Sequence, residues 1–249
     1  MPATPSWPPK SAPRLFVAGP LEAGAAVSIA GPQTHYLTRV MRVSPGDAVI
    51  LCDNITGEWA ARVISAGKRD VVLTPEELLR PREDVPDFTL CAAVIKKPNF
   101  DLVLEKATEL GVRRIEPVIT RRCVVDKLNP QRAAMIVTEA AEQCARTALP
   151  ELVAPVTLDV LLRDWPPSRI LFFADETGGD PAAAAFAANP GPAALLIGPE
   201  GGFDADERAV IRNHPQARAI SLGPRILRAE TAAIAAMALW MSFSGDWKN

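Results

Sequence analysis

Short apolar segments alternate with helix-like segments through the second half of the sequence. Apolar runs typical of buried strands lie at residues 88–95, 115–119, 169–174, 193–197 and 217–222. Segments with helical character lie between or after them, at residues 99–110, 129–146, 181–188, 204–213 and 229–243. Alternating strands and helices form a mainly parallel sheet, because each parallel connection needs a long crossover that a helix supplies. The sequence therefore predicts an α/β domain over residues 88–249.

Individual residues mark the ends of these helices. Asn99 is typical of an N-cap, and Gly111 stands where a helix commonly ends in a left-handed turn. Pro130 occupies the first turn of its helix, where proline is tolerated. Asp204 is followed three residues later by Glu207, which predicts a capping box.

The first half of the chain has a different pattern. Residues 1–13 hold five of the 24 prolines and few periodic apolar residues, so we expect a disordered leader. Residues 14–75 contain short β-like runs, separated by turn signals and interrupted by one helical stretch at residues 34–42. This pattern predicts a small β-barrel. Residues 76–87 are rich in proline and charge and are the predicted domain linker.

The composition excludes several classes of protein. The net charge is only -2, which argues against a polycationic wrapper of nucleic acid; basic side chains gather instead within residues 1–42 and 96–146. The four cysteines form no Cys-x-x-Cys pair, so we expect neither a disulfide framework nor a metal site. The longest apolar run, residues 231–241, is shorter than the roughly 20 residues that span a bilayer. We therefore expect a soluble, cytoplasmic protein.

One predicted strand runs directly into a glycine-rich loop at residues 195–203. Gly198, Gly201 and Gly202 allow close approach of the backbone to a ligand, and the loop lies at the carboxyl end of a strand, where open α/β sheets bind ligands. The loop matches neither a P-loop nor the dinucleotide-binding fingerprint. The alternative is a tight strand-to-helix turn with a solvated Glu200, which the local pattern supports equally.

A second strand enters a second Gly-Pro loop, at residues 221–232, which leads into a very apolar helix. Glu230 in the first turn of that helix suits the helix dipole. Arg228 does not, because a cation near a helix N-terminus is unfavourable unless an anion lies opposite. A phosphate, or a substrate that becomes anionic, would be such a partner.

Five parts of the sequence, in the expected order, closely resemble the RsmE family of the SPOUT superfamily: residues 14–16 with 35–42, 105–112, 139–146, 195–203 and 221–232. The similarity extends over residues 14–243, nearly the whole chain. Members of this family methylate N3 of one uridine in 16S ribosomal RNA and take the methyl group from S-adenosylmethionine. The resemblance thus implies that activity, with 16S rRNA and the small ribosomal subunit as partners.

The resemblance also implies a fold and a cofactor site. The expected fold is an N-terminal PUA-like β-barrel that binds RNA, followed by a SPOUT-type parallel-sheet domain with a deep trefoil knot. The two Gly-Pro loops are expected to hold S-adenosylmethionine. The candidate cofactor-binding residues are Ile197, Gly198, Pro199, Glu200, Gly201, Gly202, Leu222, Gly223, Ile226 and Leu227.

The chemistry of uridine methylation suggests roles for three side chains. N3 of uridine carries a proton, so it becomes a good nucleophile only when a base removes that proton and the resulting anion is stabilised. We expect Arg228 to stabilise the anion, and Glu230 to act as the base or to orient Arg228; Glu200 is the reserve candidate. The target base must be presented unstacked.

Basic side chains from both halves of the chain are candidate RNA contacts: Arg14, Arg39, Arg42, Lys96, Lys97 and Arg146. Arg39 and Arg42, three residues apart, are expected to share one helix face, with a solvated stripe as the alternative to RNA contact. For Arg146, the alternative is an ion pair with Glu142, four residues earlier.

The last helix, residues 229–243, is apolar nearly all round and must be covered on every side. We therefore expect it to contribute to the interface of the homodimer that the resemblance implies, whereas Trp240 itself is most simply a core residue. Two other functions stay open at this point. One is a non-catalytic RNA-binding or assembly factor, and the other is a sister enzyme that methylates the ribose 2′-OH or another base.

Overall fold

The computed structural model describes residues 7–125 and 127–247. The chain forms two compact units, each described below by itself. The first unit lies within Met1–Asp84 and includes Ala141–Ala148; the second comprises Val85–Ala140 and Leu149–Asn249. None of the helices in the described ranges is both long and apolar enough to cross a membrane.

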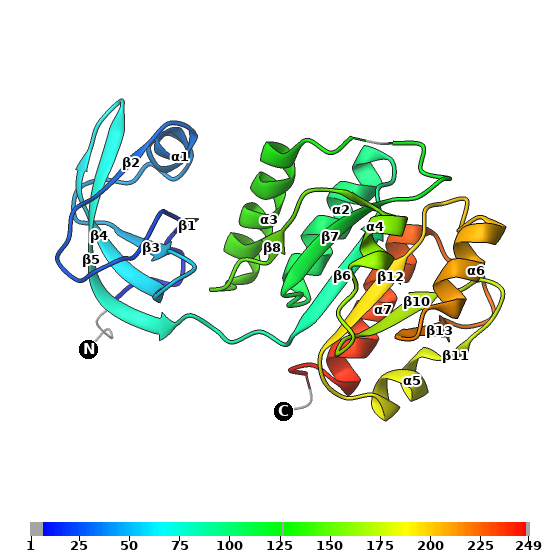
Figure 1. The fold of residues 1–249 in the computed structure, drawn as a ribbon. Helices are drawn as coiled ribbons and strands as arrows, with labels where there is room; N and C mark the ends of the chain where they lie inside the picture. Colours follow the sequence, from blue (N-terminus) through cyan, green and yellow to red (C-terminus); the bar gives the residue numbers. More distant parts are fainter. Residues whose placement is uncertain (1–6, 126, 248–249) are drawn as a thin grey trace. The chain divides into compact units, whose positions relative to one another are not determined.

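The first unit is built on a curled five-stranded sheet (Figure 1). Its strands are β1 (Arg14–Phe16), β2 (Val27–Ala30), β3 (Ala48–Cys52), β4 (Gly57–Ala66) and β5 (Asp70–Pro81). They follow the order β1-β3-β4-β5-β2, with β1 parallel to β3 and the other pairs antiparallel. In the described part of the chain β1 and β2 are the two edges, so the small β-barrel that the turn pattern predicted is a curled, open half-barrel.

The last strand of this sheet extends into the predicted linker. β5 pairs with β4 as far as Pro81, which lies opposite Gly57. Residues 76–81 therefore belong to the sheet, because their backbone groups find partners on β4 despite the prolines and charges of the segment. Only residues 82–87 connect β5 to the first strand of the second unit.

The predicted leader is partly ordered. Residues 1–6 lie outside the described residues, but the ring of Trp7 lies 3.9 Å from the guanidinium carbon of Arg62. Pro13 accepts a hydrogen bond from the backbone N–H of Ile50 (2.8 Å). A cation–π contact and a backbone bond thus fix residues 7–13 onto the sheet, so the prediction of disorder is wrong for them.

The helical stretch of the first unit begins and ends two residues earlier than predicted and is less regular. It consists of α1 (Pro32–His35) and a π-helical turn, η1 (Tyr36–Val40). Arg42 follows with a left-handed φ of 55°. Arg39 and Arg42 are both exposed, but they do not share a helix face, because the chain has left the helix before Arg42.

The second unit is built on an eight-stranded sheet in which every pair is parallel, as predicted. Its strands are β6 (Phe88–Ala93), β7 (Arg114–Ile119), β8 (Glu151–Leu152), β9 (Val156–Thr157), β10 (Ile170–Ala174), β11 (Asp180–Pro181), β12 (Ala193–Ile197) and β13 (Ala217–Ser221). Their order is β11-β13-β10-β12-β6-β7-β8, and β9 also pairs with β7. The sequence missed β8, β9 and β11 because each has only two residues. The trefoil knot stays a prediction.

Helices cover both faces of this sheet. They are α2 (Lys97–Glu109), α3 (Pro130–Cys144), α4 (Leu158–Arg163), α5 (Ala182–Ala188), α6 (Ala205–Asn213) and α7 (Ala229–Phe243). Side chains alternate along a strand, so Leu195 and Ile197 enter one core with α2, α3, α5 and α7, while Ala194 and Leu196 enter the other with α4 and α6. The short helix α4 was not predicted.

Most predicted helix ends are confirmed. Asp204 and Glu207 form the capping box of α6, Pro130 is the first residue of α3, and Gly111 follows α2 with a φ of 85°. The start of α2 is the exception. This helix begins at Lys97, two residues before the predicted N-cap Asn99, because the proline that follows Lys97 is tolerated in a first turn.

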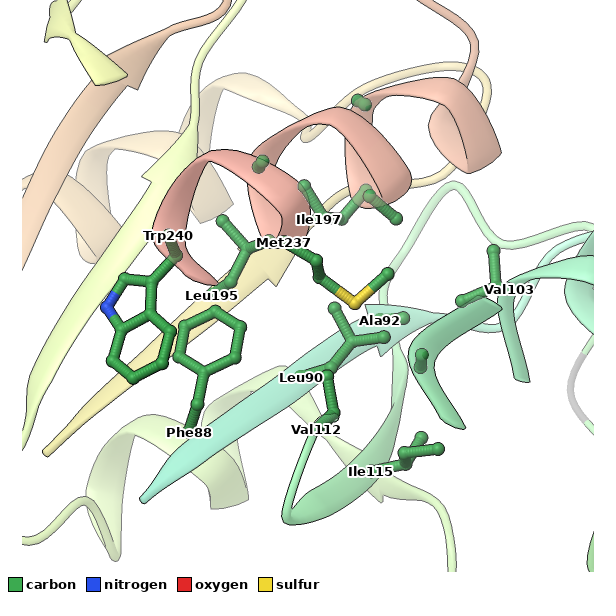
Figure 2. Packing of buried hydrophobic residues seen from close by; sticks show 14 of the residues in the cluster. Phe88, Leu90, Ala92, Val103, Val112, Ile115, Leu195, Ile197, Met237 and Trp240 are labelled. Carbon is green, nitrogen blue, oxygen red and sulfur yellow. The ribbon is translucent and has the colours of Figure 1, made fainter. Parts of the chain in front are cut away.

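The final helix, α7, packs one face into the core. Trp240 is 1% exposed and stacks on Phe88, with ring centroids 4.1 Å apart (Figure 2). Trp240 is therefore a core residue, as expected. Three apolar side chains of α7 are less covered: Ile234 and Leu239 are half-buried at the border of the core, and Phe243 is exposed.

We predict that Trp240→Ala lowers the free energy of unfolding by about 3–5 kcal/mol, because the change removes a large buried ring and leaves a cavity beside Phe88. Urea unfolding followed by circular dichroism measures the change. Trp247→Ala is the control, because Trp247 is exposed and its loss should cost no more than about 0.5 kcal/mol. Equal losses in the two variants would contradict this description of the core.

Candidate functional site

Three neighbouring strands of the second unit end at a hollow. In the order β13-β10-β12 all three are parallel, so the loops that follow them leave from the same edge of the sheet. These loops enclose about 910 Å³, counting the open mouth. An edge of this kind is where parallel α/β sheets bind ligands.

The two loops that the sequence singled out form most of this hollow. Its lining includes every predicted cofactor-binding residue except Gly201: Ile197, Gly198, Pro199, Glu200, Gly202, Leu222, Gly223, Ile226 and Leu227. A Cβ on Gly201 would instead lie 3.6 Å from the Cδ of Arg122, outside the lining. Ile226 is 89% exposed and is therefore an open part of the wall.

The backbone at Gly202 favours glycine, and a side chain there would meet a neighbouring loop. The φ of Gly202 is 66°, in the left-handed region that favours glycine. A Cβ at this position would lie 2.8 Å from Oε1 of Glu176, so the Glu176 side chain would have to shift. Glycine at this point therefore lets the loop after β12 lie directly against the loop after β10.

The loop after β10 is the part of the site that the sequence analysis missed. Ala174, Asp175, Glu176 and Gly178 all line the hollow. The sequence does contain a pattern that could have indicated this loop. An apolar strand runs into Asp-Glu-Thr-Gly-Gly at residues 175–179, and the same change from strand to glycine marked the other two loops.

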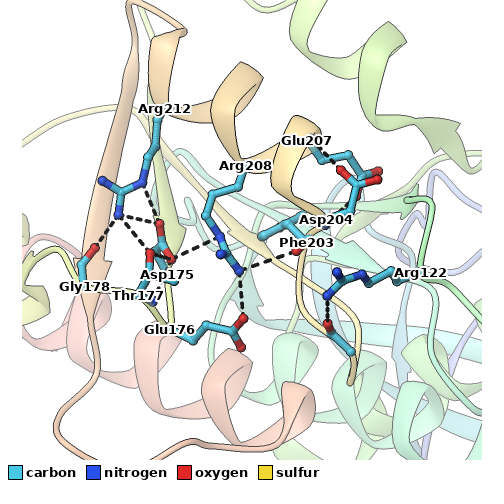
Figure 3. A network of polar contacts seen from close by, with 11 residues as sticks. Arg122, Asp175, Glu176, Thr177, Gly178, Phe203, Asp204, Glu207, Arg208 and Arg212 are labelled. Carbon is cyan, nitrogen blue, oxygen red and sulfur yellow. Dashed lines mark hydrogen bonds and ion pairs between the residues drawn. The ribbon is translucent and has the colours of Figure 1, made fainter.

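Asp175 fixes the shape of this loop. Its side chain is 1% exposed and accepts hydrogen bonds from the backbone N–H and the hydroxyl of Thr177, at 2.9 and 2.8 Å, and from Nε of Arg212 at 2.9 Å (Figure 3). Burial alone would raise the pKa of Asp175, but these hydrogen bonds and the charge of Arg212 outweigh burial and hold that pKa below its usual range.

Arg208, on α6, joins two of the loops. Its Nη2 donates to Oε1 of Glu176 at 2.7 Å and to the carbonyl of Phe203 at 3.4 Å, and its Nε lies 3.5 Å from Oδ1 of Asp175. Arg208 and Glu176 both line the hollow. One guanidinium thus ties the loop after β10 to the loop after β12 (Figure 3).

The loop after β7 supports the glycine-rich loop from its other side. Nη1 of Arg122 donates to the carbonyl of Gly201 at 2.7 Å. Nη1 of Arg121 lies 2.9 Å from both Asp204 and Asp206 at the start of α6. The sequence analysis assigned no role to either arginine.

The two proposed catalytic residues lie at the start of α7. Arg228 is the exposed N-cap, between Leu227 and Ala229, which line the hollow. Glu230 is 8% exposed, and its Oε2 has no hydrogen-bond partner among the described residues. No ion pair joins Arg228 to Glu230 in the described part of the chain, so the geometry does not support Glu230 as the group that orients Arg228.

The candidate RNA contacts differ in exposure. Arg39, Arg42, Lys96 and Lys97 are exposed. The Arg14 side chain is 21% exposed and pairs with Glu58 at 2.8 Å.

Arg146 does not fit the role of an RNA contact. Its side chain is 4% exposed, and its Nε lies 3.9 Å from Glu83 within the first unit. The prediction for Arg146 was therefore wrong, because burial leaves its charge no access to a phosphate. Glu142, the alternative partner, accepts a hydrogen bond from the backbone N–H of Phe16 at 2.8 Å.

Comparison with known proteins identifies the family. Residues 82–241 match the RNA methyltransferase domain, and residues 29–76 match the RNA methyltransferase PUA domain. A protein of Rickettsia conorii named ribosomal RNA small subunit methyltransferase E is 30% identical, over 90% of this chain and 93% of its own length. This chain belongs to the ribosomal RNA small subunit methyltransferase E family.

Further members of the methyltransferase E family agree with this assignment. The Bacillus subtilis protein of that name is 29% identical over 87% of this chain and 90% of its own length. The solved structure of the Neisseria gonorrhoeae enzyme, bound to S-adenosylmethionine, has a TM-score of 0.87 at 27% identity and covers 95% of this chain and 99% of its own. A Legionella pneumophila methyltransferase with bound cofactor has a TM-score of 0.82 at 29% identity, covering 94% and 99%.

We predict that Asp175→Asn lowers the free energy of unfolding by about 1.5–3 kcal/mol at pH 7, the usual worth of hydrogen bonds to a charged group. Because the pKa of Asp175 is lowered in the folded state, its contribution is complete above the unfolded-state pKa of about 4 and is lost as the pH falls further. Urea unfolding at pH 7 and at pH values below 4 measures the difference, with exposed Asp180→Asn as control. If the difference in unfolding free energy between the wild type and Asp175→Asn grows on acidification, the lowered pKa of Asp175 is contradicted.

Proposed function

We propose that this chain transfers the methyl group of S-adenosylmethionine to N3 of a uridine in the 16S rRNA of the small ribosomal subunit. The observation that carries the proposal is the hollow formed by the three carboxyl-end loops in a chain that belongs to the methyltransferase E family. Relatives across this family bear the name of a small-subunit rRNA methyltransferase, and two similar solved structures hold the same cofactor. An enzyme of this kind works where ribosomes are assembled, so we propose a cytoplasmic location.

The residues of the hollow fit S-adenosylmethionine. Ile197, Leu222, Ile226 and Leu227 supply an apolar wall for an adenine ring, and the glycines leave room where a Cβ would fill it. Polar groups of the loop after β10 face the same space. The bound cofactor would supply an activated methyl group on a sulfonium, and its transfer needs little covalent help from protein.

The protein would then position the uracil and stabilise its charge. Arg228 is exposed at the mouth, next to the lining residue Leu227, where its guanidinium can offset negative charge on the uracil oxygens. Glu200 lines the hollow and is exposed, so it can reach a proton on the substrate. Glu230 is buried away from the lining, and we therefore favour Glu200, the reserve candidate, as the base.

Each unit offers basic side chains for RNA. The first unit exposes Arg39 and Arg42, and the second exposes Lys96 and Lys97. Cations on a surface bind the phosphate backbone without reading sequence, so we propose that these four residues hold the RNA while the hollow selects the base. A PUA domain of RNA methyltransferases matches residues 29–76, which supports RNA binding by the first unit.

We also propose that the chain acts as a homodimer through α7. Ile234 and Leu239 of this helix are half-buried and Phe243 is exposed, so some apolar surface along α7 is left to water. A second copy packed along α7 would cover these side chains and extend toward the start of the helix, where Arg228 stands.

We predict that Gly202→Val raises the Kd for S-adenosylmethionine at least about tenfold, because the side chain meets Glu176 and the left-handed φ disfavours a β-branched residue. Isothermal titration calorimetry measures the Kd, and circular dichroism checks the fold. Gly201→Ala is the matched control, since a Cβ at that position makes only ordinary contacts with Arg122. Unchanged affinity in Gly202→Val would show that this loop is only a turn.

We predict that Arg228→Ala lowers kcat about 100-fold, the loss typical of one removed donor to a developing anion, while the Kd for S-adenosylmethionine stays within about twofold. Methyl transfer to 16S rRNA from a labelled donor, together with calorimetry, separates the two effects. Arg163→Ala, at an exposed position outside the lining of the hollow, is the control for loss of charge alone. Full activity in Arg228→Ala would remove this residue from the mechanism.

A further inference from the structure

Glu176 is a carboxylate that the fold holds in place on the wall of the hollow. Oε1 of Glu176 accepts a hydrogen bond from Nη2 of Arg208 at 2.7 Å, and both side chains line the hollow. Glu176 follows β10, whereas Arg208 lies on α6, so the pair is fixed by two separate elements (Figure 3). No role in the reaction described above uses this pair.

Arg208 is itself positioned by a buried carboxylate. Its Nε lies 3.5 Å from the buried Asp175, which is fixed in turn by Arg212 and Thr177. A side chain anchored in this way loses little further conformational entropy when a ligand binds. The network thus presents the Glu176 carboxylate in one preferred position.

The carboxylate also lies flat against the glycine-rich loop. A Cβ on Gly202 would lie 2.8 Å from Oε1 and 3.1 Å from Oε2 of Glu176. The side chain of Glu176 nevertheless stays 44% exposed, so lone pairs remain available to a ligand in the hollow. An apolar wall formed by Leu222 and Leu227 borders the same space.

The pairing with Arg208 decides which part of a ligand suits this carboxylate. S-adenosylmethionine offers three kinds of donor: the neutral ribose hydroxyls, the neutral amino group of the adenine that the apolar wall would hold, and the charged ammonium of its methionine part. The Arg208 cation offsets the charge of Glu176 but occupies only part of its acceptor capacity. A charge-compensated carboxylate favours neutral donors, and acidic side chains play this role toward ribose in other α/β folds.

We propose that Glu176 accepts hydrogen bonds from the ribose hydroxyls of the cofactor and that Arg208 is its positioning residue. This inference rests on the proposed function, since it assigns one part of S-adenosylmethionine to one side chain. It makes the loop after β10 the recognition element for ribose. The loops after β12 and β13 then enclose the rest of the cofactor.

Calorimetry with three kinds of ligand tests the proposal on the full chain. The ligands are S-adenosylhomocysteine, its 2′-deoxy and 3′-deoxy forms, and 5′-methylthioadenosine, which keeps the ribose and lacks the amino acid. Glu176→Gln should weaken S-adenosylhomocysteine and 5′-methylthioadenosine by the same factor, about tenfold, as expected for lost hydrogen bonds to a charged group. Each deoxy ligand keeps only one of the two hydroxyls, so Glu176→Gln should weaken its binding less than it weakens the binding of S-adenosylhomocysteine.

Two results would overturn the proposal. One is that Glu176→Gln loses affinity for S-adenosylhomocysteine but not for 5′-methylthioadenosine. That result would mean that Glu176 binds the ammonium. The other is unchanged affinity for both ligands in Glu176→Gln. A wild type that binds neither S-adenosylmethionine nor S-adenosylhomocysteine would refute the proposed function as well, so the two failures are distinguishable. Glu77→Gln, at an exposed site on β5, is the control for loss of one carboxylate.

The positioning role of Arg208 is tested by a measurement that would not change if Arg208 were merely structural. Arg208→Gln should lower the preference for S-adenosylhomocysteine over its deoxy forms, and Arg208→Lys should restore part of that preference because it returns the charge without the planar fork. A preference that stays the same in Arg208→Gln, with the fold intact by circular dichroism, would overturn the positioning role.

Discussion

The site depends on three neighbouring strands that run parallel and end at the same edge of one sheet. β10 lies between β12 and β13 in matched register, and Phe172 of β10 pairs with Leu195 on one side and Arg218 on the other. Because the strands are fixed by two apolar cores, the loops that follow them have little freedom in where they start. The parallel sheet therefore determines where the hollow between the three loops forms. The residues of the loops determine its chemistry.

A charge network then sets the shape of those loops. Arg208 and Arg212, both on α6, place two cations beside Asp175, and Arg208 continues to Glu176. On the other side Arg122 holds the carbonyl of Gly201. A pocket prepared in this way needs little rearrangement when a cofactor binds, and such preorganisation is the main source of catalysis when the protein supplies no covalent step.

The sequence predicted the strands and helices of the second unit well, because apolar periodicity is strong where both faces of a sheet are buried. Strand 193–197 and helix 229–243 have the predicted bounds. It could not show burial of a charged side chain, so Arg146 was taken for an RNA contact although it lies beneath the surface of its unit. Nor could it show that Trp7 contacts Arg62, since a contact between distant residues leaves no local pattern.

We propose above that this chain methylates N3 of a uridine in 16S rRNA. The most direct test is to map modified nucleotides by mass spectrometry in 16S rRNA from cells that lack the protein. We expect that one N3-methyluridine disappears, returns with the wild-type chain, and does not return with a chain that carries Gly202→Val. An unchanged set of modified uridines, or the loss of a ribose 2′-O-methyl group in its place, would contradict the claim.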